Sequence, residues 1–174
     1  GCLGVAAAGL KWKQTQKISD TQQLDNSLFS RELLQEEKNA LVQSLDYPEV
    51  AVEFAQELPS LANAAIDISD GLMADLGHVL KASGVGAKIN MDAIPVFSAM
   101  TKEIALSLAC HGGDDYQLCF TAHPEARENL LKIAKQQGIK LSRIGVITAE
   151  LGMCTVDGNN RSVAIEGKSW EHFS

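Results

Sequence analysis

Apolar residues recur at helical spacing in several segments of this 174-residue chain. Leu33, Leu34, Leu41, Val42 and Leu45 share one face, which predicts a helix over residues 30–45 with Ser30 as its N-cap. Small residues predict a closely packed helix over 4–13, and the polar stretch 14–26 predicts a surface loop. Further helices are predicted over 48–57, 70–82, 98–110 and 124–137, several of them bounded by proline or glycine.

Short apolar runs separate these helices and predict strands. They cover residues 64–68, 85–91, 116–121, 142–148, 153–156 and 162–165, the last two flanking a turn at 157–160. Strands and helices interleave, yet the chain ends in a hairpin. This order favours an α/β fold with a mixed β-sheet covered by helices, in three α/β/α layers, over a purely parallel sheet.

Composition narrows the class of protein without identifying it. Hydrophobic content of 45% and charged content of 21% are ordinary for a soluble globular domain. A net charge of −7 argues against a nucleic-acid or anionic-membrane surface. The four cysteines form no C-x-x-C pair, which argues against a zinc site and favours a reducing cytoplasmic location. No apolar run is long enough to span a bilayer.

The most informative segment is Ala64-Ala65-Ile66-Asp67-Ile68-Ser69-Asp70-Gly71-Leu72. It predicts a strand that leads through two carboxylates, a hydroxyl and a glycine into a helix. Carboxylate oxygens favour a metal, and free N–H groups at a helix N-terminus favour an anion, so this corner suits a Mg²⁺–phosphate complex. The simpler alternative is that Asp70 only caps the helix and Asp67 only ends a strand.

Two further segments are candidates for binding. The pair Gly112-Gly113 before Asp114-Asp115-Tyr116 leaves backbone groups free, although a helix C-cap followed by a turn is the favoured explanation when the motif is taken alone. Trp170, near the end of the sequence, offers a flat aromatic face for a ligand ring, or simply covers exposed apolar surface.

Five segments, in order, resemble the thiamine-monophosphate kinase family. They are Gly1–Gly4 with Ala7–Leu10, Ile66–Leu72, Gly112–Leu118, Arg143–Thr148 and Trp170–Phe173. The resemblance spans nearly the whole chain. It implies the C-terminal domain fold of the aminoimidazole ribonucleotide synthetase-like superfamily, and ATP-dependent phosphorylation of thiamine monophosphate to thiamine diphosphate.

The resemblance also implies roles for individual residues. Asp67 and Asp70 are expected to bind Mg²⁺, Ser69 to contact the co-substrate ATP, and Asp114 and Trp170 to contact thiamine monophosphate. No catalytic nucleophile is expected, because the acceptor is itself a phosphate. The chain departs from the family pattern at Asp114, which is usually Glu, at Gln117, also usually Glu, and at Val5-Ala6, where the family has Asp-Ser.

We therefore expect residues 1–174 to be a single substrate- and metal-binding domain, inactive by itself. The resemblance implies a separate N-terminal domain that supplies most of the ATP cradle and a homodimer interface. The first residue, Gly1, stands in mid-motif, which suggests a truncated chain. Two alternatives stay open: another superfamily member, such as a selenophosphate or aminoimidazole ribonucleotide synthetase, or a non-catalytic phosphoester-binding module.

Overall fold

The computed structural model describes residues 1–18 and 28–164, and it confirms the predicted α/β class. Six α-helices are described: α1 (Val5–Ile18), α2 (Gln35–Asp46), α3 (Val52–Glu57), α4 (Leu72–Ser83), α5 (Lys102–His111) and α6 (Arg127–Gln136). Five strands accompany them: β1 (Ala62–Ile68), β2 (Gly86–Asn90), β3 (Gln117–Ala122), β4 (Gly145–Thr148) and β5 (Gly152–Val156).

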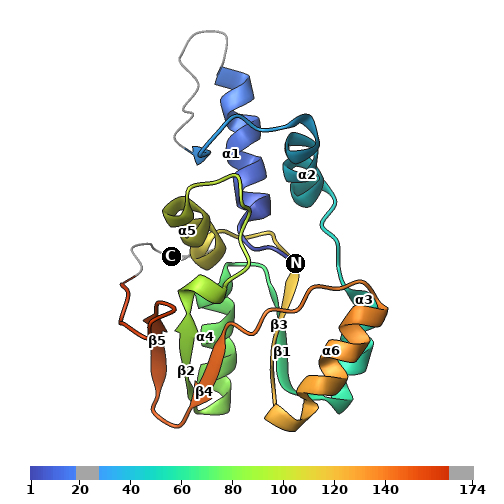
Figure 1. Ribbon diagram of the computed structural model, residues 1–174, viewed down its shortest axis with the longest axis vertical. Helices are drawn as coiled ribbons and strands as arrows, with labels where there is room; N and C mark the ends of the chain where they lie inside the picture. The colour runs from blue at the N-terminus through green and yellow to red at the C-terminus, as the bar shows by residue number, and fades with distance from the viewer. Residues whose placement is uncertain (19–27, 165–174) are drawn as a thin grey trace.

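The described strands form two sheets, where the sequence predicted one. β1 pairs with β3 antiparallel, with Ile66 opposite Cys119 and Ile68 opposite Gln117. In the other sheet β2 lies between β4 and β5, antiparallel to β4 and parallel to β5. Pairing is therefore mixed, as expected. Figure 1 shows the sheets side by side, with α3 and α6 next to β1 and β3, and with α1 and α2 at one end.

Three apolar clusters hold these layers together. One joins α4 to β2 and the end of β1, and includes Ile68, Leu72, Leu76, Leu80 and Ile89. A second packs α1, α2 and α5 around Leu41 and Ala105. The third lies between α3, α6 and the β1–β3 sheet, around Phe54 and Leu130. The strand-to-helix corner at Ile68–Leu72 is thus anchored on both sides by buried leucine and isoleucine.

Helix α4 is bounded by two glycines with positive φ. Gly71 precedes it with φ 99°, and Gly84 follows it with φ 65°. At the C-terminal end the Val85 N–H donates to the Leu80 carbonyl at 3.1 Å, which closes the helix in a left-handed glycine cap. These two residues fix the ends of the helix that begins at the candidate site.

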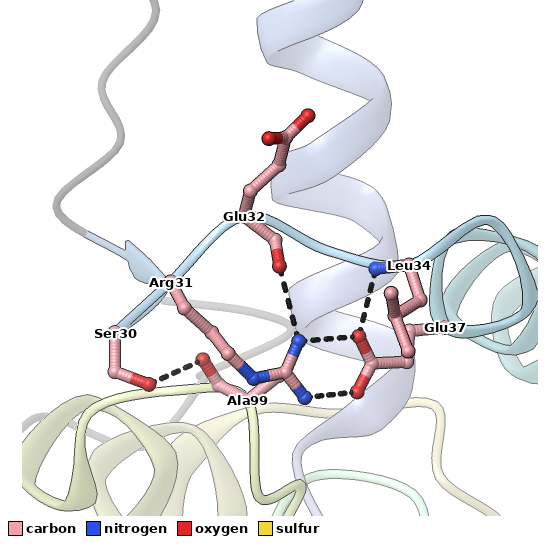
Figure 2. A network of polar contacts seen from close by, with 6 residues as sticks. All are labelled: Ser30, Arg31, Glu32, Leu34, Glu37 and Ala99. Carbon is pink, nitrogen blue, oxygen red and sulfur yellow. Dashed lines mark hydrogen bonds and ion pairs between the residues drawn. The ribbon is translucent and has the colours of Figure 1, made fainter.

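Helix α2 starts later than predicted, and Ser30 is not its N-cap. The Ser30 hydroxyl donates to the Ala99 carbonyl at 3.0 Å. The helix begins at Gln35, and Glu37 accepts the Leu34 N–H at 2.9 Å while pairing with Arg31 at 2.6 Å, as Figure 2 shows. The Glu37 carboxylate, three residues inside the helix, takes the capping role predicted for the Ser30 hydroxyl. Ser30 cannot cap the helix because its N–H and its hydroxyl both bond to the Ala99 carbonyl.

Other boundaries also differ. α1 continues through residues 14–18, predicted as loop. Gln14 and Gln16 are exposed, and polar residues are tolerated on the solvent-facing side of a helix. α3 begins at Val52 rather than residue 48. The predicted final hairpin is shorter than expected: Val156 bridges Ser162, and the Val163 N–H donates to the Thr155 carbonyl at 3.0 Å. The other edge of β5 pairs with β2.

All four cysteines are free thiols, with Cys110 buried and Cys119 partly buried. Burial raises the pKa of each of these two thiols to about 11. Within residues 1–18 and 28–164, helices are too short or too polar to cross a bilayer.

Candidate functional site

The turn after β1 is fixed by a carboxylate from the helix that follows it. Asp75, in the first turn of α4, is 3% exposed, and its Oδ2 accepts the N–H groups of Ser69 and Asp70, both at 2.9 Å. A Cβ at Gly71 would stand 2.7 Å from the Cys110 carbonyl oxygen, so this position needs glycine both for its φ and for its space. The corner is therefore rigid and tightly packed.

This arrangement changes two expectations about the corner. The residue at the N-cap of α4 is Gly71 rather than Asp70. The N–H groups of Ser69 and Asp70 are not free for a phosphate, because they already donate to Asp75. The corner carries the carboxylates of Asp67 and Asp70 and has fewer backbone N–H groups free to donate. It therefore suits a cation better than an anion without a metal.

The glycine-rich loop after α5 lies directly on this turn. The Asp114 N–H donates to the Ser69 carbonyl at 2.9 Å, and the Tyr116 N–H donates to the Ile68 carbonyl at 2.8 Å. A Cβ at Gly113 would come within 2.5 Å of the Ser69 carbonyl oxygen, so the close approach requires glycine. Both backbone groups of Ser69 are thus engaged, and its hydroxyl is the group that can reach a ligand.

Asp115 connects the same loop to the start of the chain. Its carboxylate is 5% exposed and accepts the Gly4 N–H at 2.5 Å and the Ala6 N–H at 3.2 Å. Burial raises the pKa of Asp115 to about 6, and the bonds from the backbone N–H groups oppose that rise. The segment where the family's Asp-Ser is replaced by Val5-Ala6 is therefore held through its backbone, with Val5 buried.

The loop keeps an unusual backbone. Asp114 and Tyr116 have φ values of 67° and 49°, a region that costs most side chains energy. Between them Asp115 points into the protein, while Asp114 is exposed and Tyr116 is 37% exposed. The strained conformation turns two polar side chains outward on either side of a buried one.

The predicted site residues are brought together in part. Asp67, exposed at the end of β1, lies in the same segment as Ser69 and Asp70, which are half-buried, and backbone bonds bring Asp114 beside them. Trp170 lies outside the described residues. The described part of the chain holds no group of three or more His, Cys, Asp or Glu side chains placed to bind a metal.

The sequence analysis gave no functional role to Asp75, Asp115 or His111. Asp75 has one available signal, since a carboxylate inside an apolar helix stripe between Leu72 and Leu76 is unusual. His111 ends α5, and its two ring nitrogens are buried without a hydrogen-bond partner among the described residues. Burial lowers the pKa of His111, which favours the neutral imidazole.

The fold and this corner define a class. Residues 6–154 match the family described as AIR synthase related protein, C-terminal domain, and the chain belongs to that family. This confirms the superfamily expected from the sequence motifs.

Particular relatives are thiamine-monophosphate kinases. The chain is 38% identical over 154 residues to that of Salmonella typhimurium (strain LT2), covering 84% of this chain and 47% of the relative. It superposes on the thiamine-monophosphate kinase of Stenotrophomonas maltophilia K279a with a TM-score of 0.75 and 31% identity, over 94% of this chain and 49% of that one.

A structure named AaThiL complexed with AMPPCP and TMP gives a TM-score of 0.71 at 26% identity, over 99% of this chain and 49% of that one. The chain thus spans about half the length of the relatives that it matches.

Proposed function

We propose that this chain is the metal- and acceptor-binding half of a thiamine-monophosphate kinase, which transfers a phosphoryl group from ATP to thiamine monophosphate. The observation that carries the proposal is the bond from the Asp114 N–H to the Ser69 carbonyl at 2.9 Å. It joins the segment assigned to metal and nucleotide to the segment assigned to the acceptor. Relatives named for this activity, and one named as a complex with AMPPCP and TMP, support it.

The residues at the corner fit Mg²⁺ by their chemistry. Asp67 and Asp70 offer hard carboxylate oxygens, which Mg²⁺ prefers. Mg²⁺ in such enzymes is commonly held by one or two carboxylates together with substrate phosphates and water, so a cluster of three protein ligands is not required. When bound, the ion neutralises the crowded negative charge of the phosphates.

The chain's own residues then bind and orient. The Ser69 hydroxyl contacts ATP in this proposal, while the Ser69 N–H and carbonyl stay bonded within the protein. Asp114 contacts thiamine monophosphate from the strained loop, and Trp170 stacks on its rings. No protein nucleophile is needed, because the acceptor phosphate oxygen attacks directly and catalysis rests on positioning.

The rest of the enzyme lies outside this chain in our proposal. An N-terminal domain provides most of the ATP cradle and the homodimer interface, and residues 1–174 form the C-terminal domain. We infer that the enzyme works in the cytoplasm, where ATP and Mg²⁺ are available, and that these 174 residues alone do not turn over ATP.

The test is formation of thiamine diphosphate by the intact protein with ATP, Mg²⁺ and thiamine monophosphate. The 174-residue chain alone, as a control, should give no product. Binding of thiamine monophosphate to the intact protein without any turnover would favour the phosphoester-binding module instead. Rapid turnover by the isolated chain would disprove the need for a second domain.

The acceptor assignment can be tested separately at Trp170. We expect Trp170→Ala to raise the KM for thiamine monophosphate about fivefold, because an aromatic–cation contact contributes on the order of 1 kcal/mol. The KM for ATP should stay nearly constant, and Trp170→Phe should recover most of the loss. If Trp170→Ala instead lowers only the melting temperature, Trp170 covers the domain and does not bind the acceptor.

A further inference from the structure

Two buried carboxylates lie within the candidate site without having a role in it so far. Among the described residues, Asp75 and Asp115 are the charged side chains that are buried, at 3% and 5% exposure. A buried carboxylate is costly unless hydrogen bonds satisfy it. Asp75 accepts the N–H groups of Ser69 and Asp70, which are themselves candidate ligands. Asp115 lies next to the candidate ligand Asp114 and accepts N–H groups from the start of the chain.

Asp75 controls the metal side of the corner. One oxygen, Oδ2, receives both the Ser69 and the Asp70 N–H, so a single atom fixes two consecutive peptide groups. Fixing those peptides fixes the direction in which the Ser69 and Asp70 side chains leave the turn. Asp75 itself is inside the protein, so it acts on the site through these two residues.

Asp115 controls the acceptor side. Its two oxygens receive different groups, Oδ2 the Gly4 N–H and Oδ1 the Ala6 N–H. These bonds anchor the middle of the strained loop, so that Asp114 and Tyr116 keep positive φ values and turn outward. Without an anchor, a loop that stores backbone strain would relax toward an ordinary conformation.

The two carboxylates belong to one continuous series of hydrogen bonds. Asp75 binds the turn at Ser69, the Ser69 and Ile68 carbonyls bind the loop at Asp114 and Tyr116, and Asp115 within that loop binds the start of α1. Three segments far apart in the sequence are thereby held in a fixed relation.

We propose that Asp75 and Asp115 are positioning residues, Asp75 for the metal- and nucleotide-binding side chains of the 69–70 turn and Asp115 for the acceptor-binding loop. The assignment of the two sides rests on the proposed function. The positioning itself rests on the hydrogen bonds. The two parts can therefore fail separately.

The geometry predicts opposite outcomes for the same conservative substitution. Asp75→Asn keeps one carbonyl oxygen, which is all that the Ser69 and Asp70 N–H groups use. Asp115→Asn replaces one of two accepting oxygens with an NH₂ group that faces an N–H donor, so a bond is lost and a repulsion gained. Asparagine should thus substitute at residue 75 and fail at residue 115.

Kinetics of the intact enzyme test the two sides. We expect Asp75→Ala to lower kcat by about 10–100-fold and to raise the Mg²⁺ concentration needed, as when other groups that orient metal ligands are lost, and Asp75→Asn to restore most of both. Asp115→Asn should raise the KM for thiamine monophosphate by about tenfold or more and leave the Mg²⁺ requirement unchanged.

Asp157 provides the matched control. Its Oδ1 also accepts two backbone N–H groups, from Asn159 at 2.9 Å and Arg161 at 2.8 Å, in the turn after β5. Asp157→Ala should leave kcat, KM and the Mg²⁺ requirement near wild type. Equal losses in Asp157→Ala and Asp75→Ala would overturn the proposal, as would wild-type kinetics in Asp75→Ala.

Amide hydrogen exchange tests the positioning without reference to activity. In Asp75→Asn the Ser69 and Asp70 amides should keep wild-type protection, while in Asp115→Asn the Gly4 or Ala6 amide should exchange about five- to tenfold faster. If Asp75→Ala does not fold, this pair of asparagine variants still decides. Unchanged Gly4 and Ala6 exchange in Asp115→Asn overturns the positioning. A protein that shows these exchange rates but no kinase activity overturns the proposed function only.

Discussion

Carboxylates are held in two different ways in this molecule. At the surface, Glu37 pairs with Arg31 and Asp92 pairs with Lys102 (Figure 2 shows the first pair). Hydrogen bonds from these cations lower the pKa of Glu37 and of Asp92. At the corner, Asp75 and Asp115 are buried and accept backbone N–H groups, and burial raises the pKa of Asp115 to about 6.

The difference lies in what happens to the negative charge. Glu37 and Asp92 each also accept one backbone N–H, but the cation beside each cancels its charge, so a surface pair leaves little electric field behind. Backbone N–H groups supply hydrogen bonds but no full positive charge, so Asp75 and Asp115 fix the backbone and keep the corner negative. A negative, rigid corner beside Asp67 and Asp114 suits a cation-dependent reaction, whereas the surface pairs suit only local structure.

The largest expected effect concerns kinase activity, and it separates the carboxylates proposed to bind Mg²⁺ at the corner from a carboxylate of a surface pair. Asp67→Asn and Asp70→Asn should each lower kinase activity by more than about 100-fold at limiting Mg²⁺, since even groups that only orient a ligand cost about 10–100-fold. Stability should change little. Asp92→Asn, which weakens a surface pair, should keep near wild-type activity in the same assay. Wild-type kinetics at limiting Mg²⁺ in both corner variants would make these carboxylates structural.

The next effect is the pH dependence of stability, which should differ between buried Asp115 and the surface carboxylates. Burial raises the pKa of Asp115 in the folded protein to about 6, above the ordinary value of 3.8. Between pH ~4 and ~6 the folded protein therefore keeps a proton that the unfolded chain has lost, so stability falls as pH rises, by at most about 3 kcal/mol. The surface carboxylates have lowered pKa values and gain stability as pH rises through a more acidic range.

Denaturant unfolding of wild type and Asp115→Asn at pH values from 4 to 7 measures this contribution. We expect the difference in unfolding free energy between the two proteins to change most between pH ~4 and ~6 and to level off near pH ~7, where folded Asp115 has lost its proton. A constant difference over the whole range would show that burial of Asp115 does not shift its titration.

A third comparison concerns the crowding of the corner. Gly71 and Gly84 flank α4, and both have positive φ. A Cβ at Gly84 meets nothing within 4 Å, but one at Gly71 meets the Cys110 carbonyl oxygen at 2.7 Å. Gly84→Ala should cost about 1 kcal/mol from its backbone conformation alone, and Gly71→Ala about 2–3 kcal/mol or more. Thermal unfolding of both variants checks this, and equal losses would mean that the corner relaxes easily.

The sequence predicted the elements better than their connections. The apolar stripe of α4 and the run into β1 gave both within a few residues, because local periodicity determines them. The motifs also placed Asp67, Ser69, Asp70 and Asp114 in two segments that prove to be neighbours. Residue spacing cannot show which backbone groups a carboxylate reaches across 111 positions, as Asp115 does to Gly4.

The same limit explains the errors. Ser30 has the chemistry of an N-cap, but a contact 69 residues away takes its hydroxyl. The predicted hairpin after residue 153 is present in part, through the Val156–Ser162 bridge and the Val163 N–H that donates to the Thr155 carbonyl, but the parallel pairing of β5 with β2 was not predicted. In both cases the local pattern does not show a contact made by a distant part of the chain, and only the folded chain shows it.

The smallest expected effect comes from the surface pair that replaced Ser30 as the cap of α2. Glu37 accepts the Leu34 N–H and pairs with Arg31, so Glu37→Ala loses both, whereas Glu37→Gln keeps an accepting oxygen and loses the charge. We expect Glu37→Gln to lower the melting temperature only slightly and to leave kinase activity unchanged. The difference in melting temperature from wild type should shrink between ~0.1 and ~1 M salt, because the Debye length falls from about 10 to about 3 Å over that range. Salt screens buried groups far less than exposed ones. The pH-dependent contribution of Asp115 to the free energy of unfolding should therefore persist at the same salt concentrations. If the Glu37→Gln difference also persisted at high salt, the surface pair would be holding structure in the way that the buried carboxylates do, and the distinction between the two regions would fail.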